Sequence, residues 1–189
     1  MKAVNIVLCG LGGQGILFMT KVLAQAGLDK GLKVLGAETH GMAQRGGSVV
    51  SHLRFGEVAG SLVKTASAQL LLALDESEGY RNLPFVAPGG RMYVNTDSKD
   101  FPAARVKDYA ARKEILCSGI AAEAIAQELG AVLSSNLVLL GFFSGREGNP
   151  IQAEEMRATL ERISPEKFRE ANLRVFDAGV HKAREESPR

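Results

Sequence analysis

The amino-acid sequence predicts an α/β fold whose sheet is largely parallel. An apolar, β-branched run from Ala3 to Cys9 ends in a glycine-rich loop, GLGGQG, and a helical pattern begins at Ile16. A run with so little alternation is typical of a strand covered on both faces of a parallel sheet. Lys33 to Ala37 is expected to be the second strand. The chain therefore opens with a β-α-β unit, which should cross over right-handed.

Length, composition and charge narrow the class of protein further. The 189 residues are 46% hydrophobic and 23% charged, so we expect one globular domain over residues 1–189. A net charge of +2 without a long basic run argues against nucleic acid as the main partner. The start, MKAVNIVLCG, lacks the pattern of a signal peptide, and no stretch reaches the roughly 18 apolar residues of a membrane span. We therefore expect a cytoplasmic protein that does not bind a membrane.

The two cysteines, Cys9 and Cys117, lie in separate apolar runs. By themselves they cannot hold an iron–sulfur cluster or a four-ligand zinc ion. We expect two buried, reduced thiols rather than a disulfide or a catalytic thiol, and no metal site.

The next elements follow from local patterns. The first helix is expected over Ile16 to Lys30, with Gly31 as its stop. The polar segment Glu38 to Gly47 predicts a loop. Ser48 to Phe55 nearly alternates, which predicts a strand near a sheet edge, where an antiparallel orientation is one option. Its His52 and Arg54 share a face, which a surface pair or a subunit contact explains at least as well as a functional site does.

The second half of the sheet is expected from three apolar runs: Gln69 to Leu74, Arg91 to Asn95 and Glu114 to Cys117. Asp75 is expected to cap a short helix that ends at Leu83. The acidic cluster of Asp75, Glu76 and Glu78 is explained by capping and helix-dipole complementarity. Thr96 to Arg112 has no clear period, so at most two short strand-like pieces are expected there.

The remainder of the chain is expected to be helical. Asn136 to Phe143 is apolar all round, as in a helix buried between layers. The other expected helices are Ile120 to Leu129, the amphipathic stretch marked by Ala153, Met156, Leu160 and Ile163, and a final helix that starts at Ser164 and Pro165. The inner stripe of the final helix is expected to be Phe168, Ala171 and Val175. His181, in the same helix, is expected to be solvated.

The first motif is the glycine loop, in which Gly10, Gly12 and Gly15 match the spacing G-x-G-x-x-G. Backbone N–H groups at a helix N-terminus form an anion site, and Glu38 stands where a dinucleotide fold places its ribose-binding acid. Two observations oppose a dinucleotide site: an unusual second loop follows, and no residue set for hydride transfer can be identified. A tight turn with a purely structural role is the other interpretation.

The second motif is THGMAQRGGS, in which His40 and Arg45 are crowded among glycines that include Gly46 and Gly47. Arg45 could donate two hydrogen bonds to a phosphate or carboxylate, and His40 could act as an acid, a base or a donor. For His40 alone a structural role is the simpler interpretation. The whole loop, however, follows the second strand beside the first loop, where open α/β sheets bind ligands and partners. The sequence contains no nucleophile–histidine–acid set.

Read together, GLGGQGILF and AETHGMAQRGGSVVSHLRFG closely resemble the small, gamma-type subunit of 2-oxoacid:ferredoxin oxidoreductases, above all the small (beta) subunit of the indolepyruvate type. ASAQLLLALDESE and NLRVFDAG extend the resemblance over essentially the whole chain. Family members commonly carry Ala-Asp where this chain has Ala68-Gln69, so any role of an acid there is lost. The resemblance implies a three-layer α/β/α sandwich with a mixed, mostly parallel sheet, Rossmann-like but not a true dinucleotide fold.

The resemblance also implies an activity. Such complexes oxidatively decarboxylate 2-oxoacids to acyl-CoA and reduce ferredoxin. Thiamine diphosphate, magnesium and the iron–sulfur clusters are then expected in a large partner subunit, and coenzyme A is the one cofactor that this chain could share. The chain alone is expected to be inactive, and its isolated form could pair as a homodimer through a surface meant for the partner. The specific 2-oxoacid stays open.

The resemblance implies a cofactor-facing role for both loops, with no catalytic residue assigned. Arg45 and the N–H groups of Gly12 to Gly15 are the natural phosphate contacts. The cofactor-binding candidates are Gly10, Gly12, Gly13, Gln14, Gly15, His40, Arg45, Gly46 and Gly47. The alternative function is a free-standing nucleotide- or dinucleotide-binding module.

Overall fold

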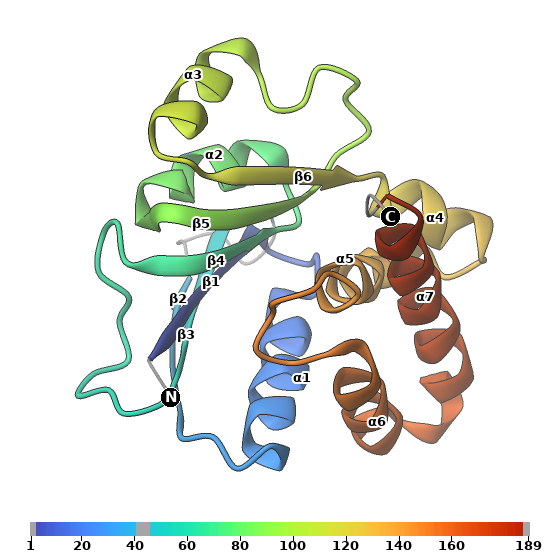
Figure 1. Ribbon diagram of the computed structural model, residues 1–189. Helices are drawn as coiled ribbons and strands as arrows, with labels where there is room; N and C mark the ends of the chain where they lie inside the picture. The colour runs from blue at the N-terminus through green and yellow to red at the C-terminus, as the bar shows by residue number, and fades with distance from the viewer. Residues whose placement is uncertain (1–2, 41–45, 187–189) are drawn as a thin grey trace.

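One six-stranded sheet forms the middle layer of the protein, as the computed structural model of residues 3–40 and 46–186 shows (Figure 1). Its strands are β1 (Val4–Leu11), β2 (Val34–His40), β3 (Ser48–Phe55), β4 (Ala68–Ala73), β5 (Val86–Asn95) and β6 (Leu116–Ile120). The strand order is β2-β3-β1-β4-β5-β6. β3 runs antiparallel to both of its neighbours, whereas β1, β4, β5 and β6 are mutually parallel.

Helices cover both faces of this sheet. One face carries α2 (Glu76–Asn82) and α3 (Ala104–Arg112), together with the 3-10 turn η1 (Leu83–Phe85). The other face carries α1 (Ile16–Asp29), α4 (Ala122–Glu128), the turn η2 (Val132–Ser134), α5 (Ser135–Ser144), α6 (Ala153–Ile163) and α7 (Glu166–Glu185). This arrangement confirms the predicted α/β/α sandwich with a mixed, mostly parallel sheet. Within the described ranges, no helix has both the length and the apolarity of a membrane span.

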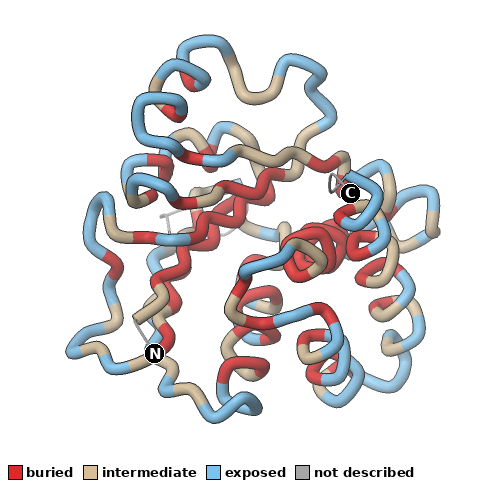
Figure 2. Tube along the Cα trace, in the orientation of Figure 1, coloured by how far each residue is buried: buried red, intermediate tan, exposed pale blue. Residues whose placement is uncertain are grey.

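The strands divide their side chains between two cores because successive residues point to opposite faces. On β1, Ile6 and Leu8 face the five-helix side, whereas Val7 and Cys9 face α2. The glycine loop after β1 therefore lies at the point where both cores end. Figure 2 shows that burial is concentrated on the central strands and on α5.

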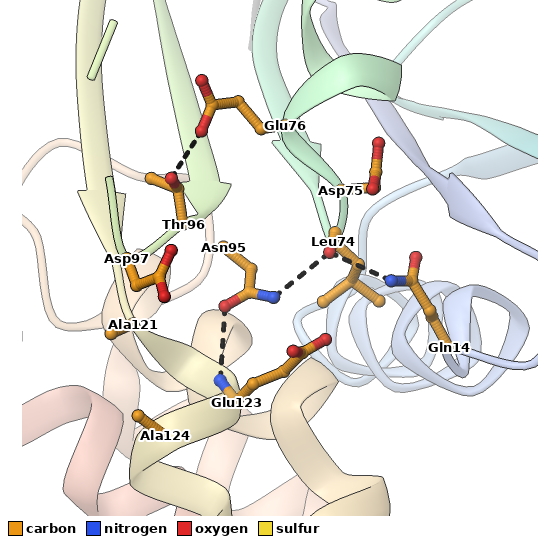
Figure 3. Close-up of a pocket in the computed structure, with 10 residues that line it drawn as sticks. All are labelled: Gln14, Leu74, Asp75, Glu76, Asn95, Thr96, Asp97, Ala121, Glu123 and Ala124. Atoms are coloured by element: carbon orange, nitrogen blue, oxygen red, sulfur yellow. Dashed lines mark hydrogen bonds between the residues drawn. The ribbon is translucent and has the colours of Figure 1, made fainter. Parts of the chain in front are cut away.

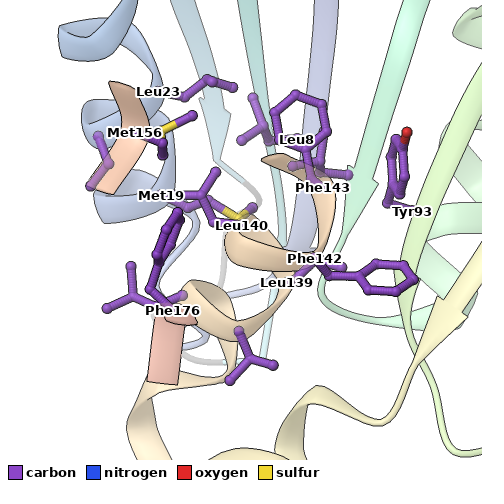
Figure 4. Close-up of a cluster of buried hydrophobic side chains, with 14 of the residues drawn as sticks. Leu8, Met19, Leu23, Tyr93, Leu139, Leu140, Phe142, Phe143, Met156 and Phe176 are labelled. Atoms are coloured by element: carbon purple, nitrogen blue, oxygen red, sulfur yellow. The ribbon is translucent and has the colours of Figure 1, made fainter. Parts of the chain in front are cut away.

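Helix α5 is buried along its whole length, as its uniformly apolar sequence predicts. It lies between the sheet and α7, with Tyr93 of β5 edge-on to the rings of Phe142 and Phe143 (Figure 4). Two glycines permit the close approach of α5 to α7. A Cβ on Gly141 would overlap the backbone carbonyl of Phe176, and a Cβ on Gly179 would overlap that of Val138.

Several expectations for single elements are wrong. β3 is an inner strand between β2 and β1, so its position near an edge is incorrect, although its antiparallel orientation is found. Residues 38–40 extend β2 instead of starting the loop. The segment before β6 contains the helix α3, which buries only Val106 and Ala110.

The inner stripe of the final helix is also displaced from its expected position. Phe168 is 51% exposed, whereas Val175 is buried as expected. The buried residues of α7 are Asn172, Val175, Phe176, Gly179, Val180 and Ala183. The stripe starts at Asn172 instead of Phe168 and continues to Gly179, where α7 packs against α5.

His52 and Arg54 do not form a surface pair. His52 is buried, stands edge-on to Phe85 with 5.3 Å between ring centroids, and accepts a hydrogen bond at Nδ1 from the Val63 N–H at 3.3 Å. Arg54 donates to Asn5 Oδ1 at 2.8 Å and to the Gly60 carbonyl at 2.7 Å. Both side chains hold the loop that follows β3 against the sheet.

The stability of the fold should depend on pH through His52. Burial lowers the pKa of His52 below its ordinary value of 6.5. Between the two pKa values the unfolded chain binds a proton that the folded chain does not, so the free energy of unfolding falls as pH drops below 6.5. The H52Q variant should show a flatter dependence from pH 7 to about 5 in urea titrations. Equal slopes for both proteins would contradict this assignment.

Candidate functional site

The two glycine loops predicted from the sequence are joined through their backbones. The N–H of Gly12 donates to the carbonyl of Gly47 at 2.8 Å, and the N–H of Gly46 donates to the carbonyl of Gly12 at 3.3 Å. The register of β1 against β3 ends at Leu11 opposite Ser48, so these bonds continue the ladder beyond the strand ends. The predicted proximity of the loops is therefore present in the described residues.

The first loop needs its glycines for two different reasons. Gly13 and Gly15 have φ values of 102° and 84°, a region that side chains with a Cβ disfavour. Gly10 instead leaves room for a neighbour, because a Cβ there would lie 2.6 Å from Oε1 of Gln14. That oxygen accepts a hydrogen bond from the Leu11 N–H at 2.7 Å, so the Gln14 side chain closes the turn from inside.

Gln14 also connects this loop to the neighbouring strand. Its Nε2 donates to the carbonyl of Leu74, just beyond β4, at 3.3 Å. Asn95, the last residue of β5, donates to the same carbonyl at 3.2 Å and accepts from the N–H of Ala122 at 2.9 Å. A chain of side-chain amides therefore bridges the carboxyl ends of the parallel strands (Figure 3).

A pocket of about 250 Å³ lies at this bridge. It is lined by Gln14, Leu74, Asp75, Glu76, Asn95, Thr96, Asp97, Ala121, Glu123 and Ala124. β1 leads into α1 on one face of the sheet, and the adjacent β4 leads into α2 on the other face. The pocket therefore occupies the crevice where the winding of the sheet reverses, which is the usual ligand position in open α/β folds.

The charge of this pocket is unfavourable for phosphate. Among the residues that the structure describes, its lining contains the four carboxylates of Asp75, Glu76, Asp97 and Glu123 and no lysine, arginine or histidine. Asp75 caps α2 by accepting from the Glu78 N–H at 2.9 Å, as the sequence predicts. Bound anions would therefore meet repulsion on this side of the glycine loop.

The hydrogen bonds within the loop also limit the expected phosphate contacts. The N–H of Gly12 donates a hydrogen bond to the carbonyl of Gly47, and the N–H of Gln14 donates one to the carbonyl of Leu11 at 3.1 Å. Two of the N–H groups expected to bind phosphate are thus already engaged. Arg45 lies outside the described residues, as does the side chain of His40, so their contacts stay predictions.

Asn95, Thr96, Asp97 and Glu123 line the crevice but were not predicted as site residues, and Asp75 and Glu76 were predicted only as capping residues. Asn95, Thr96 and Asp97 follow the apolar run of β5, in the same way that Asp75 follows β4. The available signal was the position of polar residues directly after consecutive parallel strands, whose carboxyl ends meet at one edge of the sheet. Within residues 3–40 and 46–186, no group of three histidine, cysteine or acidic side chains is arranged to hold a metal ion.

Both cysteines are free thiols. Cys9 is fully buried, and burial, followed by the nearby carboxylates of Glu78 and Asp75, strongly raises the pKa of its thiol. Cys117 is half-buried, and burial raises its pKa as well. Because the thiolate is the reactive form, both should alkylate slowly at pH 8.

The two thiols should react with alkylating reagents at different rates, because they differ in solvent exposure. Iodoacetamide labelling followed by mass spectrometry should modify Cys117 well before Cys9 in the folded protein, and both at equal rates in urea. Rapid labelling of Cys9 in the folded state would show that β1 opens locally and would contradict its buried position.

These features define a doubly wound α/β protein. It has a crevice for a ligand or a partner where the winding of the sheet reverses, and two glycine loops joined by backbone hydrogen bonds lie beside that crevice. Comparison with known proteins gives the family. The chain belongs to the pyruvate ferredoxin/flavodoxin oxidoreductase family, whose sequence model matches residues 5–182. The resemblance inferred from the paired glycine motifs is thereby confirmed.

Relatives and solved structures agree with this membership. The chain is 35% identical to the indolepyruvate oxidoreductase subunit IorB of Methanothermobacter thermautotrophicus, over 96% of this chain and 98% of the relative. It is 34% identical to IorB of Pyrococcus horikoshii, over 98% of both chains. The gamma subunit of a keto/oxoacid ferredoxin oxidoreductase from Geobacter sulfurreducens shares the fold, with a TM-score of 0.76 at 21% identity, over 96% of this chain and 99% of that one.

The same fold also occurs within longer chains. The ketoisovalerate oxidoreductase subunit VorA of Methanothermobacter thermautotrophicus is 28% identical over 96% of this chain, which corresponds to 37% of that subunit. A 2-oxoglutarate:ferredoxin oxidoreductase from Magnetococcus marinus matches with a TM-score of 0.79 at 22% identity, over 99% of this chain and 32% of its own. In both proteins the fold is therefore accompanied by further polypeptide.

Proposed function

We propose that this chain is the small subunit of an indolepyruvate-type 2-oxoacid:ferredoxin oxidoreductase. The observation that carries the proposal is the match to the IorB subunits, which spans almost the whole of both chains at 34–35% identity. The match to the ketoisovalerate subunit is weaker and covers only 37% of that chain. An aryl 2-oxoacid is therefore the proposed substrate class.

The complex oxidatively decarboxylates its 2-oxoacid to the acyl-CoA and transfers the electrons to ferredoxin. In this proposal the large subunit holds thiamine diphosphate, magnesium and the iron–sulfur clusters. Two free cysteines on separate strands, β1 and β6, are consistent with clusters held elsewhere. The described part of this chain contributes a rigid surface rather than reacting groups.

The tied glycine loops form the proposed contact surface near the thiamine site. Backbone without side chains at Gly12 and Gly13 permits close approach, and the bonds between Gly12 and the second loop fix its shape before binding. Coenzyme A is proposed to contact the second loop through Arg45. The negative lining of that crevice argues against the alternative of a free-standing dinucleotide-binding module.

Co-expression with the large subunit tests this function. The two chains should co-purify and catalyse viologen reduction that depends on coenzyme A, faster with indolepyruvate or phenylpyruvate than with pyruvate or a branched-chain 2-oxoacid. Each subunit alone should be inactive. Tight binding of NAD by the isolated chain, without co-purification, would overturn the proposal.

The proposed role of Arg45 has a separate test. In the assembled complex, R45A should weaken the apparent affinity for coenzyme A about tenfold or more, because it removes a charge-assisted bond to phosphate. R45K is the matched variant that keeps the positive charge. An unchanged affinity in R45A would exclude this residue while leaving the assignment of the complex intact.

A further inference from the structure

Within the part of the chain that the structure describes, no strand pairs with the outer edge of β2. β2 is the last strand on its side of the sheet and pairs only with β3 among the described residues. The carbonyl of Lys33 accepts from the N–H of Gly56 at 2.8 Å, which makes this a hydrogen-bonded pair of the antiparallel ladder. Because such pairs alternate along the ladder, the N–H and C=O groups of Val34 and Gly36 point away from β3.

An apolar groove of about 430 Å³ runs beside this edge. It is lined by Leu17, Thr20, Lys21 and Ala24 of α1, by residues Val34, Gly36, Ala37 and Glu38 of β2, and by Leu53 of β3. Among the residues that line it, Leu17 is a large apolar side chain that is 45% exposed. β2 contains no proline or lysine, residues with which exposed edge strands are usually protected.

No contact with the described residues requires a glycine at position 36. It lies in the interior of β2, where glycine weakens a strand, and its φ is not in the left-handed region. A Cβ at this position would meet only the His52 carbonyl at 3.5 Å and Leu53 Cδ1 at 3.8 Å, both ordinary contacts. Glycine in such a position commonly marks the close approach of another backbone.

We propose that the β2 edge and the groove beside it are the docking site for an extended strand of the large subunit, an inference that rests on the proposed function. Outward N–H and C=O groups select an extended backbone over a helix, and an apolar groove selects alternating aliphatic side chains.

The large subunit is favoured over a second copy because this fold recurs with further polypeptide. It makes up 37% of the ketoisovalerate subunit VorA and 32% of the Magnetococcus marinus chain. In such chains its surface has other protein segments available to cover it. In a separate small subunit, a strand of the large subunit covers the β2 edge in their place.

The test compares G36V with wild type in the co-expressed complex. Valine should fill the groove and lower the affinity for the large subunit about tenfold or more. The thermal midpoint of the isolated chain should be unchanged or higher, because a β-branched residue replaces glycine in a strand. G60V is the matched control, since Gly60 is exposed with no atom within 4 Å of an added Cβ, and it should assemble normally.

Two further measurements keep the result clear if G36V folds poorly. G36P removes only an outward N–H, so it should block docking without removing a bond to β3. In the wild-type protein, amide exchange at Gly36 should be fast in the isolated chain and slow in the complex.

The outcomes separate the two proposals. Normal assembly of G36V, or unprotected Gly36 in the complex, would overturn the docking site and leave the proposed function standing. Failure of wild type to bind the large subunit would overturn the proposed function. If the isolated chain sediments as a dimer that G36V converts to a monomer while the complex still assembles, the occupant is a second copy and our assignment is wrong.

Discussion

Gly179→Ala is expected to lower the free energy of unfolding by about 3 kcal/mol. The added methyl group would overlap the carbonyl of Val138 in α5, and a backbone atom cannot move aside as a flexible side chain can. Relief requires α7 to move away from α5, which would open a gap in the largest core. Gly141→Ala, which meets the carbonyl of Phe176 from the other helix, should have a similar effect.

Urea denaturation followed by circular dichroism measures this loss. Gly60→Ala provides the control, because an added Cβ there meets no atom within 4 Å, and its stability should stay within about 0.5 kcal/mol of wild type. A Gly179→Ala protein as stable as the control would show that the two helices are not in backbone contact.

Gly15→Ala should have the second largest effect, a loss of about 2 to 3 kcal/mol. Gly15 caps α1 with a φ of 84°, a conformation that costs other residues about 1–2 kcal/mol. An added Cβ would also lie 2.5 Å from Nδ2 of Asn136, whose side chain donates to the Gly15 carbonyl at 3.1 Å. The substitution therefore strains the first loop and disturbs the start of α5.

A double-mutant comparison separates the cost of the strained backbone at Gly15 from the cost of the contact with Asn136. In an Asn136→Ala background the contact is absent, so Gly15→Ala should cost about 1 kcal/mol less than in the wild-type background. Gly13→Ala is the matched control for backbone strain alone, because its φ is 102° and nothing lies within 4 Å of an added Cβ. Equal losses for Gly15→Ala in both backgrounds would remove Asn136 from the explanation.

Local patterns predicted most of the elements. β1, α1, α5 and α6 were found because each is long and has a strong apolar signal of its own. Helix α3 was missed because it lies on the outer layer and buries little. These outcomes depend on how much apolar surface an element buries against the core.

Strand order could not be predicted in the same way. The near-alternation of β3 was interpreted as a sign of an edge, yet β3 is covered by α1 on one face and by the loop after it on the other. That loop is held by His52, whose partners Val63 and Phe85 are 11 and 33 positions away in the chain. Contacts between residues so far apart in the chain produce no periodic pattern in the sequence, so local patterns could not predict them.

The candidate site was predicted in part. The paired glycine motifs indicated two adjacent loops, and the bonds between Gly12 and Gly47 are present. The acidic lining of the neighbouring crevice was not predicted, because Asp75, Asp97 and Glu123 come from three separate segments. Their convergence follows from the parallel order of β4, β5 and β6, which only the assembled sheet reveals.

The enclosure of α5 also has a consequence for how the protein is made. An apolar helix that is covered on one side by the sheet and on the other by α7 has no stable position until α7 has been synthesised. During translation the ribosome releases α5 before its cover, so the nascent chain exposes a segment that chaperones recognise. Completion of the core is therefore a late event, and the yield of folded protein should depend on chaperone capacity during expression.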